Sequence, residues 1–192
     1  MTNRRAAENN QSSVLKGLAA GTVAGLVASW TMEEFQVLWV KAARAKKDSH
    51  GNGADGSSST NKADRPHSRR EAQEPSTVKA AEMISEKVLG RKLAKDQKKF
   101  AGNAVHYTTG GASGAVYGVA AELAPEVTVG AGLPFGTAVW LAIDEGAVPL
   151  LGLSKGPTEY PLSTHVYALA SHFVYGLTTE VVRRVLRKTV LQ

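Results

Sequence analysis

Histidines and carboxylic acids lie within apolar stretches of this sequence, where ionisable side chains are rare. His172 and Glu180 lie between Leu162 and Lys188, a stretch that is apolar for about one bilayer width of roughly 20 helical residues. Ionisable groups in lipid are costly and usually face a bundle interior or water. The candidate polar network comprises His106, Tyr117, Glu122, Asp144, Glu145, His165, His172 and Glu180.

Three kinds of chemistry suit these residue types. In a structural role, His–Glu hydrogen bonds hold helices in register and Glu180 pairs with Arg183 or Arg184. In a proton-conducting or pH-sensing role, histidines titrate near neutral pH and burial raises the pKa of glutamate toward that range. A zinc site or hydrolase is disfavoured, because the sequence lacks HExxH, cysteine and a recognisable nucleophile motif. We therefore expect no enzyme activity, catalytic residue, metal or cofactor.

The spacing predicts which of these groups share a face. Seven residues separate His165 from His172, so both lie on nearly the same side of a helix. Glu180 lies about 80° further round and about 12 Å along the axis from His172. If the second and fourth spans are antiparallel, His106 lies toward the level of Glu180 and Glu122 toward that of His165. This arrangement predicts a His–Glu pair at each end of the bundle.

Four apolar segments supply the bundle that these groups require. The predicted fold is all-α, an integral membrane bundle of about four transmembrane helices plus one amphipathic surface helix. The expected order is a disordered tail (1–13), helix 1 (14–40), a flexible polar linker (41–75), the amphipathic helix (76–99) and a membrane domain (100–188) that contains helix 2 (100–125), helix 3 (127–153, kinked or re-entrant) and helix 4 (162–188).

Glycines repeat every four residues in the first two spans, a spacing that lets helices approach closely. The two rows are Gly17, Gly21 and Gly25 in helix 1, and Gly110, Gly114 and Gly118 in helix 2. We expect these rows to pack against each other. The alternatives are that small residues are simply common in membrane helices, or that the rows join two copies or a membrane partner.

Basic residues are concentrated in one part of the chain. Of 23 Lys and Arg, 15 lie between Lys41 and Lys99, and the net charge is +6. Because these charges lie in a Ser/Gly-rich linker or at helix ends, nucleic-acid binding is not expected, and the lysines near residue 95 are expected to meet lipid headgroups. Four crossings with cytoplasmic termini place the terminal charges correctly but leave the linker in the periplasm.

Several spacings together resemble the YagU-like family of uncharacterised bacterial inner-membrane proteins. They are His172 with Glu180 and Arg183-Arg184, His106 with Tyr117, Glu122 and Pro125, an acid at Glu33 or Glu34, and Pro149 before Leu151-Gly152-Leu153. The resemblance implies a multi-pass protein of the bacterial inner membrane, with the lipid bilayer as its surroundings and no established enzyme activity. Asp144, Glu145 and the long linker depart from that pattern.

The main functional interpretation is therefore a multi-pass inner-membrane protein whose His and Glu side chains hold helices together. A proton-conducting or pH-sensing protein is the first alternative. A subunit that assembles with itself or with a membrane partner protein is the second.

Overall fold

The computed structural model describes residues 2–51 and 74–190, with side chains from Gln11 to Lys46 in the first range. These residues form helices and no β-strand, which confirms the all-α class for the described part of the chain. The elements are α1 (Thr2–Gly51), α2 (Ser76–Ile84), the π-helical η1 (Ser85–Leu89), α3 (Lys95–Leu123), the 3-10 turn η2 (Pro125–Thr128), α4 (Leu133–Val139), the π-helical η3 (Trp140–Ala147), α5 (Val148–Leu150), the 3-10 turn η4 (Pro157–Glu159) and α6 (Leu162–Thr189).

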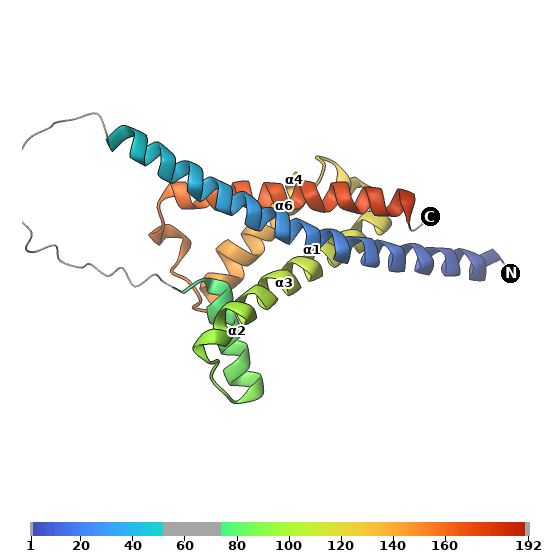
Figure 1. Cartoon of the computed structure of the whole chain (residues 1–192). Coiled ribbons are helices and arrows are strands. Elements are labelled where there is room, and N and C mark those ends of the chain that lie inside the picture. Colours follow the sequence, from blue (N-terminus) through green and yellow to red (C-terminus); the bar gives the residue numbers. More distant parts are fainter. Residues whose placement is uncertain (1, 52–73, 191–192) are drawn as a thin grey trace, which may run out of the picture.

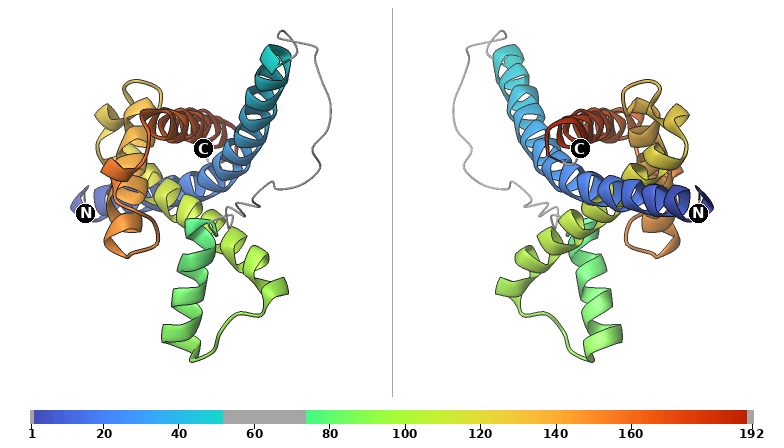
Figure 2. Two further views of the ribbon diagram at one scale, coloured as in Figure 1. Left: turned by 90° about the vertical axis from the view of Figure 1, so that its left-hand side faces the viewer. Right: turned by 90° about the vertical axis from the view of Figure 1, so that its right-hand side faces the viewer.

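The main helices alternate in direction along the chain. α1 runs against α3, because Gly17 lies beside Gly118 and Gly25 beside Gly110. The segment from α4 to α5 likewise runs against α6, and both chain ends lie at the same end of the bundle (Figure 1). α2 and the start of α3 project as a separate lobe (Figure 2).

The closest helix contact joins α1 to α3 through the two glycine rows. A Cβ on Gly17 would lie 2.6 Å from the Gly118 carbonyl oxygen, and one on Gly114 would lie 2.7 Å from the Gly25 Cα. Distances below 3 Å leave no room for a methyl group, so the backbones themselves are in contact. The structure therefore places the two rows against each other.

A second close contact, between α4 and α6, was not anticipated from the sequence. A Cβ on Gly176 would lie 3.0 Å from the Gly136 Cα, and Gly132 faces the same part of α6. Gly132 and Gly136 are also four residues apart, so the same spacing signal was present. Pro134 lies between these two glycines at the start of the helix, so the sequence predicted a kink there rather than a contact surface.

Aromatic rings fill the middle of the bundle. The Tyr117 and Phe135 rings stack with centroids 4.3 Å apart and planes inclined by 20°. Tyr175 packs near Phe135, and its hydroxyl donates a 2.6 Å hydrogen bond to the Gly110 carbonyl oxygen. Side chains from α3, α4 and α6 therefore meet in one layer.

The structure corrects the boundaries of the first helix. α1 extends from Thr2 to Gly51, so residues 2–13 continue the helix rather than form a disordered tail, and residues 41–51 prolong it into the expected linker. No proline interrupts this range, and Ala, Glu, Gln, Lys and Arg favour helix at both ends. The rest of the predicted linker, up to residue 73, lies outside the described residues.

The surface helix is also shorter than the predicted 76–99. It ends with η1 at Leu89, because Gly90 adopts a left-handed conformation with φ of 63° that terminates the helix. The Ser85 hydroxyl closes this turn by donating a 2.7 Å hydrogen bond to the Arg91 carbonyl oxygen. Lys95 then begins α3, so residues 95–99 belong to the next helix.

The third apolar region forms one helical run from Leu133 to Leu150 rather than a hairpin. It keeps one direction along α6, from Gly132 beside Gly176 to Glu145 beside His165. Its π-helical part precedes Pro149, whose ring would clash with the carbonyl of a regular helical turn.

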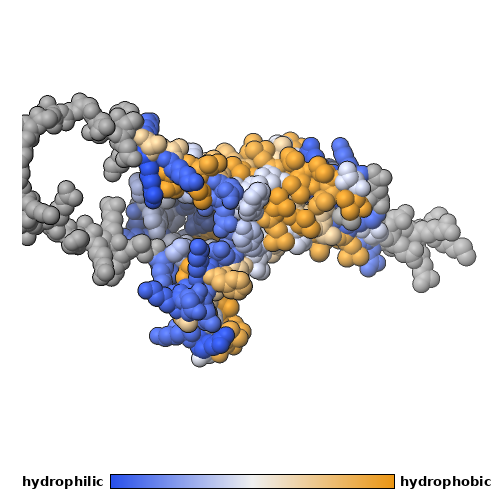
Figure 3. Space-filling model, in the orientation of Figure 1, coloured by the Kyte–Doolittle hydropathy of each residue, from blue (hydrophilic) through white to orange (hydrophobic). Residues whose placement is uncertain are grey.

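Large apolar side chains are exposed on all of these main helices. They include Leu18, Leu26 and Trp30 in α1, Val116 in α3, Leu141 in η3, and Val166, Leu177, Val181 and Val185 in α6. On the face seen in Figure 3, a hydrophobic region lies between more hydrophilic ends. Among the described residues, one helix, Gln11–Lys46, is long and apolar enough to cross a membrane by length and composition.

Replacing Gly114 by leucine is expected to separate α1 from α3, because the Gly25 backbone occupies the space that a Cβ needs. We expect a loss of about 1–3 kcal/mol or more in the free energy of unfolding, measured in detergent. Ala112→Leu, on the exposed side of α3, is the matched control and is expected to change stability little. Equal stability of the two variants would contradict the observed contact.

Candidate functional site

Polar side chains inside the bundle gather in two clusters. The ionic cluster, near the chain ends, consists of Tyr117, Glu122, Glu180, Arg183, Arg184 and Arg187. The histidine cluster, toward the other end, consists of His106, Asp144, Glu145, His165 and His172. Each cluster draws side chains from more than one helix, so each ties helices together.

Glu180 is the centre of the ionic cluster and is only 1% exposed. Arg183 donates two hydrogen bonds to its carboxylate, from Nε at 2.8 Å and from Nη2 at 3.0 Å. Arg184 donates a third, and the Tyr117 hydroxyl donates a fourth from α3 at 3.0 Å. The carboxylate is therefore ionised and enclosed by donors, as a buried charge must be.

Glu122 joins α3 to the end of α6. Arg187 donates to both of its carboxylate oxygens, from Nε at 2.6 Å and Nη2 at 2.8 Å, in the bidentate geometry that guanidinium groups favour. Arg183 Nη1 lies 3.9 Å from the same carboxylate, so Arg183 stands between the two acids. The cluster is thus a continuous ionic chain from Glu122 to Arg184.

The outer part of the histidine cluster is a strong pair. His165 Nδ1 lies 2.7 Å from Glu145 Oε1, and its Nε2 lies 3.0 Å from the Pro157 carbonyl oxygen. Both ring nitrogens therefore face oxygen acceptors. Only the protonated imidazolium, which has two N–H donors, satisfies both contacts. This pair fastens η3 and the η4 turn to the start of α6.

The inner part of the same cluster is looser. His172 Nδ1 donates a 2.9 Å hydrogen bond to the Ala168 carbonyl oxygen and lies 3.8 Å from Asp144 Oδ2, beyond hydrogen-bond distance. The Asp144 side chain remains 40% exposed. His106 lies nearby on α3, with Nε2 3.4 Å from the Ser29 carbonyl oxygen of α1.

The π-helical η3 explains why two consecutive acids, Asp144 and Glu145, both reach α6. A π-helix has a wider turn than an α-helix, so adjacent side chains diverge less around its axis. Asp144 consequently approaches His172 while Glu145 contacts His165. These two histidines lie on one face of α6, as their spacing predicts.

The predicted His–Glu pairs between the second and fourth spans are wrong. Glu122 lies beside Arg187, and Tyr117 beside Glu180, so α3 and α6 run in the same direction. Helices separated by one intervening antiparallel helix must run parallel, and the assumption of antiparallel packing was the error. His106 therefore lies near the level of His172, away from Glu180, and Glu122 lies far from His165.

Two partnerships were missed from the sequence. Arg187 lies one turn beyond Arg183 on α6, and that four-residue spacing could have placed both on the side facing Glu122. The Tyr107 hydroxyl donates a 2.6 Å hydrogen bond to Glu33 of α1, which no local pattern predicts. Among the described residues, no group of three or more His, Asp or Glu side chains could hold a metal ion.

The model of a protein family described as "Protein of unknown function (DUF1440)" matches residues 64–181, more than half of the 192-residue chain. The chain belongs to this family. Within the described residues, the DUF1440 match contains α2 to α5 and most of α6, including Glu122, Glu180 and the histidine cluster. Arg183, Arg184 and Arg187 follow it. No curated protein and no solved structure matches the chain.

Replacing Glu180 by glutamine is expected to remove the charge that pairs with the buried Arg183 at hydrogen-bond distance, leaving only Glu122, 3.9 Å away, as its counter-charge. We expect a loss of about 3–5 kcal/mol in the free energy of unfolding, measured by denaturant titration in detergent. Glu126→Gln removes the same charge from an exposed position after α3 and serves as the control. A Glu180 variant as stable as the control would show that the enclosed carboxylate does not hold α3 against α6.

Proposed function

We propose that this DUF1440 protein is a multi-pass protein of the bacterial inner membrane, of the YagU-like kind, whose buried ionic and histidine clusters hold its helices in register. The observation that carries the membrane assignment is the band of apolar side chains exposed on α1, α3, the run from α4 to α5, and α6. Figure 3 shows one face of this band. A water-soluble bundle of this size rarely leaves so much contiguous apolar surface exposed.

The alternating helix directions support four crossings. The run from Leu133 to Leu150 comprises 18 residues, or about 27 Å of regular helix, which approaches the roughly 30 Å hydrocarbon core of a bilayer. α3 and α6 are longer. An even number of crossings places both chain ends on one side, as Figure 1 shows them at one end of the bundle.

Terminal charge supports a cytoplasmic location for both ends. Arg183, Arg184 and Arg187 lie at the end of α6, and Arg4 and Arg5 precede the apolar part of α1. Lys and Arg near the ends of spans favour the cytoplasm, whereas long loops follow this rule weakly. The long basic loop between α1 and α3 is then periplasmic.

A structural role for the polar residues agrees best with their contacts. Four hydrogen bonds already engage Glu180, and one of its donors, Tyr117, stacks on Phe135, so the ionic cluster is part of the packing of α3, α4 and α6. The α1 and α3 glycine rows are occupied by each other, which favours packing within one chain over a dimer.

pH sensing within the histidine cluster is the second candidate function. The observation that favours it is the 3.8 Å separation of His172 from Asp144, beside a hollow of about 250 Å³ that Asp144, Glu145 and His165 line. Protonating His172 would strengthen its attraction to Asp144 and draw η3 toward α6.

Single cysteines test the topology directly, because the natural chain contains none. We expect Lys155→Cys and Lys95→Cys to react with a membrane-impermeant maleimide in intact spheroplasts. Gln11→Cys and Glu126→Cys are expected to react only after permeabilisation. Labelling of Glu126→Cys and Lys155→Cys from the same side would show that the run from Leu133 to Leu150 does not cross the membrane.

Proton flux into liposomes separates the structural from the proton-conducting role. With purified protein we expect no flux above protein-free liposomes between about pH 5 and pH 8, because four donors already engage Glu180 in a structural role. Flux that disappears in a folded His172→Ala variant and persists in His165→Ala would replace the structural role with a proton pathway through His172.

A further inference from the structure

The lobe formed by α2, η1 and the start of α3 is fixed to the rest of α3. A Cβ on Gly102 would lie 3.3 Å from the Val78 Cα, so α2 approaches the α3 backbone closely. Within the lobe, Lys98 at the start of α3 forms ion pairs with two acids. Its Nζ lies 2.7 Å from Glu82 of α2 and 2.9 Å from Glu74. The lobe is therefore an ordered unit at the end of the bundle opposite the chain ends (Figure 1).

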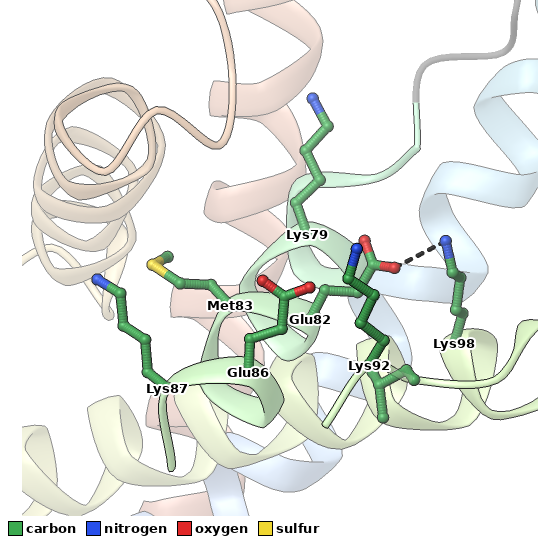
Figure 4. A pocket seen from close by; sticks show the side chains of 8 residues that line it. Lys79, Glu82, Met83, Glu86, Lys87, Lys92 and Lys98 are labelled. Atoms are coloured by element: carbon green, nitrogen blue, oxygen red, sulfur yellow. Dashed lines mark ion pairs between the residues drawn. The ribbon is translucent and has the colours of Figure 1, made fainter. Parts of the chain in front are cut away.

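The lobe contains a basic hollow of about 500 Å³ (Figure 4). Four lysines line it, Lys79, Lys87, Lys92 and Lys98, against the two acids Glu82 and Glu86. Glu74 also pairs with Lys98, so four lysines stand against three acids and one positive charge remains in excess. Lys98 donates hydrogen bonds to Glu82 and Glu74, which raise its pKa, so that lysine remains charged at neutral pH. A site of this size and charge suits a phosphate-bearing group.

Apolar side chains stand exposed beside the hollow. Val88 is 75% and Phe100 79% exposed, and Ile84 and Leu89 are more than half exposed. In Figure 3 the lobe has a hydrophobic edge on the side of the apolar band and a hydrophilic edge on the other side. Large apolar groups next to lysines are the pattern of an element that lies in the membrane interface.

We propose that this hollow binds the phosphate of an anionic phospholipid headgroup, while Val88, Leu89 and Phe100 insert among the acyl chains. The proposal rests on the membrane location proposed above. A lipid satisfies both surfaces at once, since its phosphate meets the lysines and its chains cover the apolar edge. Free phosphate would leave that edge in water. Lys98 is bound to two carboxylates, so Lys79, Lys87 and Lys92 supply the positive charge for the headgroup.

Native mass spectrometry of the full-length protein in detergent, titrated with phosphatidylglycerol or phosphatidylcholine, tests this inference. The pocket variant is Lys79→Gln/Lys87→Gln/Lys92→Gln, which keeps Lys98 and its two ion pairs. The control variant is Lys41→Gln/Arg44→Gln/Lys155→Gln, which removes the same charge from exposed basic residues outside the lobe. Circular dichroism verifies that both variants retain the helical content of the natural chain.

We expect one phosphatidylglycerol to bind more tightly than phosphatidylcholine, with affinity at least about tenfold weaker in the pocket variant and nearly unchanged in the control. Equal binding by both variants, or no preference for the anionic lipid, would overturn the proposal. Inorganic phosphate that competes with the lipid at equal affinity would overturn the lipid assignment.

The maleimide experiment reads the topology separately from lipid binding. Correct labelling with no lipid preference refutes the headgroup site alone. Labelling of Glu126→Cys and Lys155→Cys from the same side refutes the four crossings, whereas the lipid titration still decides the headgroup site.

Discussion

The enclosure of the Glu180 carboxylate is the constraint on which the rest of the bundle depends. A charge that is 1% exposed is tolerated only when donors surround it, and those donors come from Arg183, Arg184 and Tyr117. The tyrosine fixes α3 beside α6 and stacks on Phe135, which fixes α4. One buried acid thereby sets the relative positions of three helices.

Close contact between helix backbones is the second feature that holds the bundle together. Along the α1–α3 and α4–α6 contacts, glycines bring main chains together without intervening side chains. Such contacts lose little side-chain entropy and depend on dispersion between closely packed backbones. The larger apolar side chains are then left to face outward, which is why Leu26, Trp30 and Val181 are exposed rather than buried.

Periodic features were predictable, whereas features set by tertiary contacts were not. The apolar run beginning at Leu162 and the proline at Pro125 indicated where α6 begins and α3 ends, and the structure places these boundaries within two residues. The end of the surface helix at Gly90 was missed, since a left-handed glycine resembles any other in sequence. The pairing of Glu122 with Arg187 required the relative direction of α3 and α6, which was wrongly assumed.

The parallel pairing of α3 with α6 has a consequence for the order of synthesis. Glu122 emerges from the ribosome some sixty residues before Arg187, the arginine that binds both of its oxygens. Until α6 is made, Glu122 and Tyr117 lack their ionic partners, and a chain shortened before Arg183 never acquires them. The helical bundle therefore reaches its stable arrangement only after the last turns of α6 have been translated.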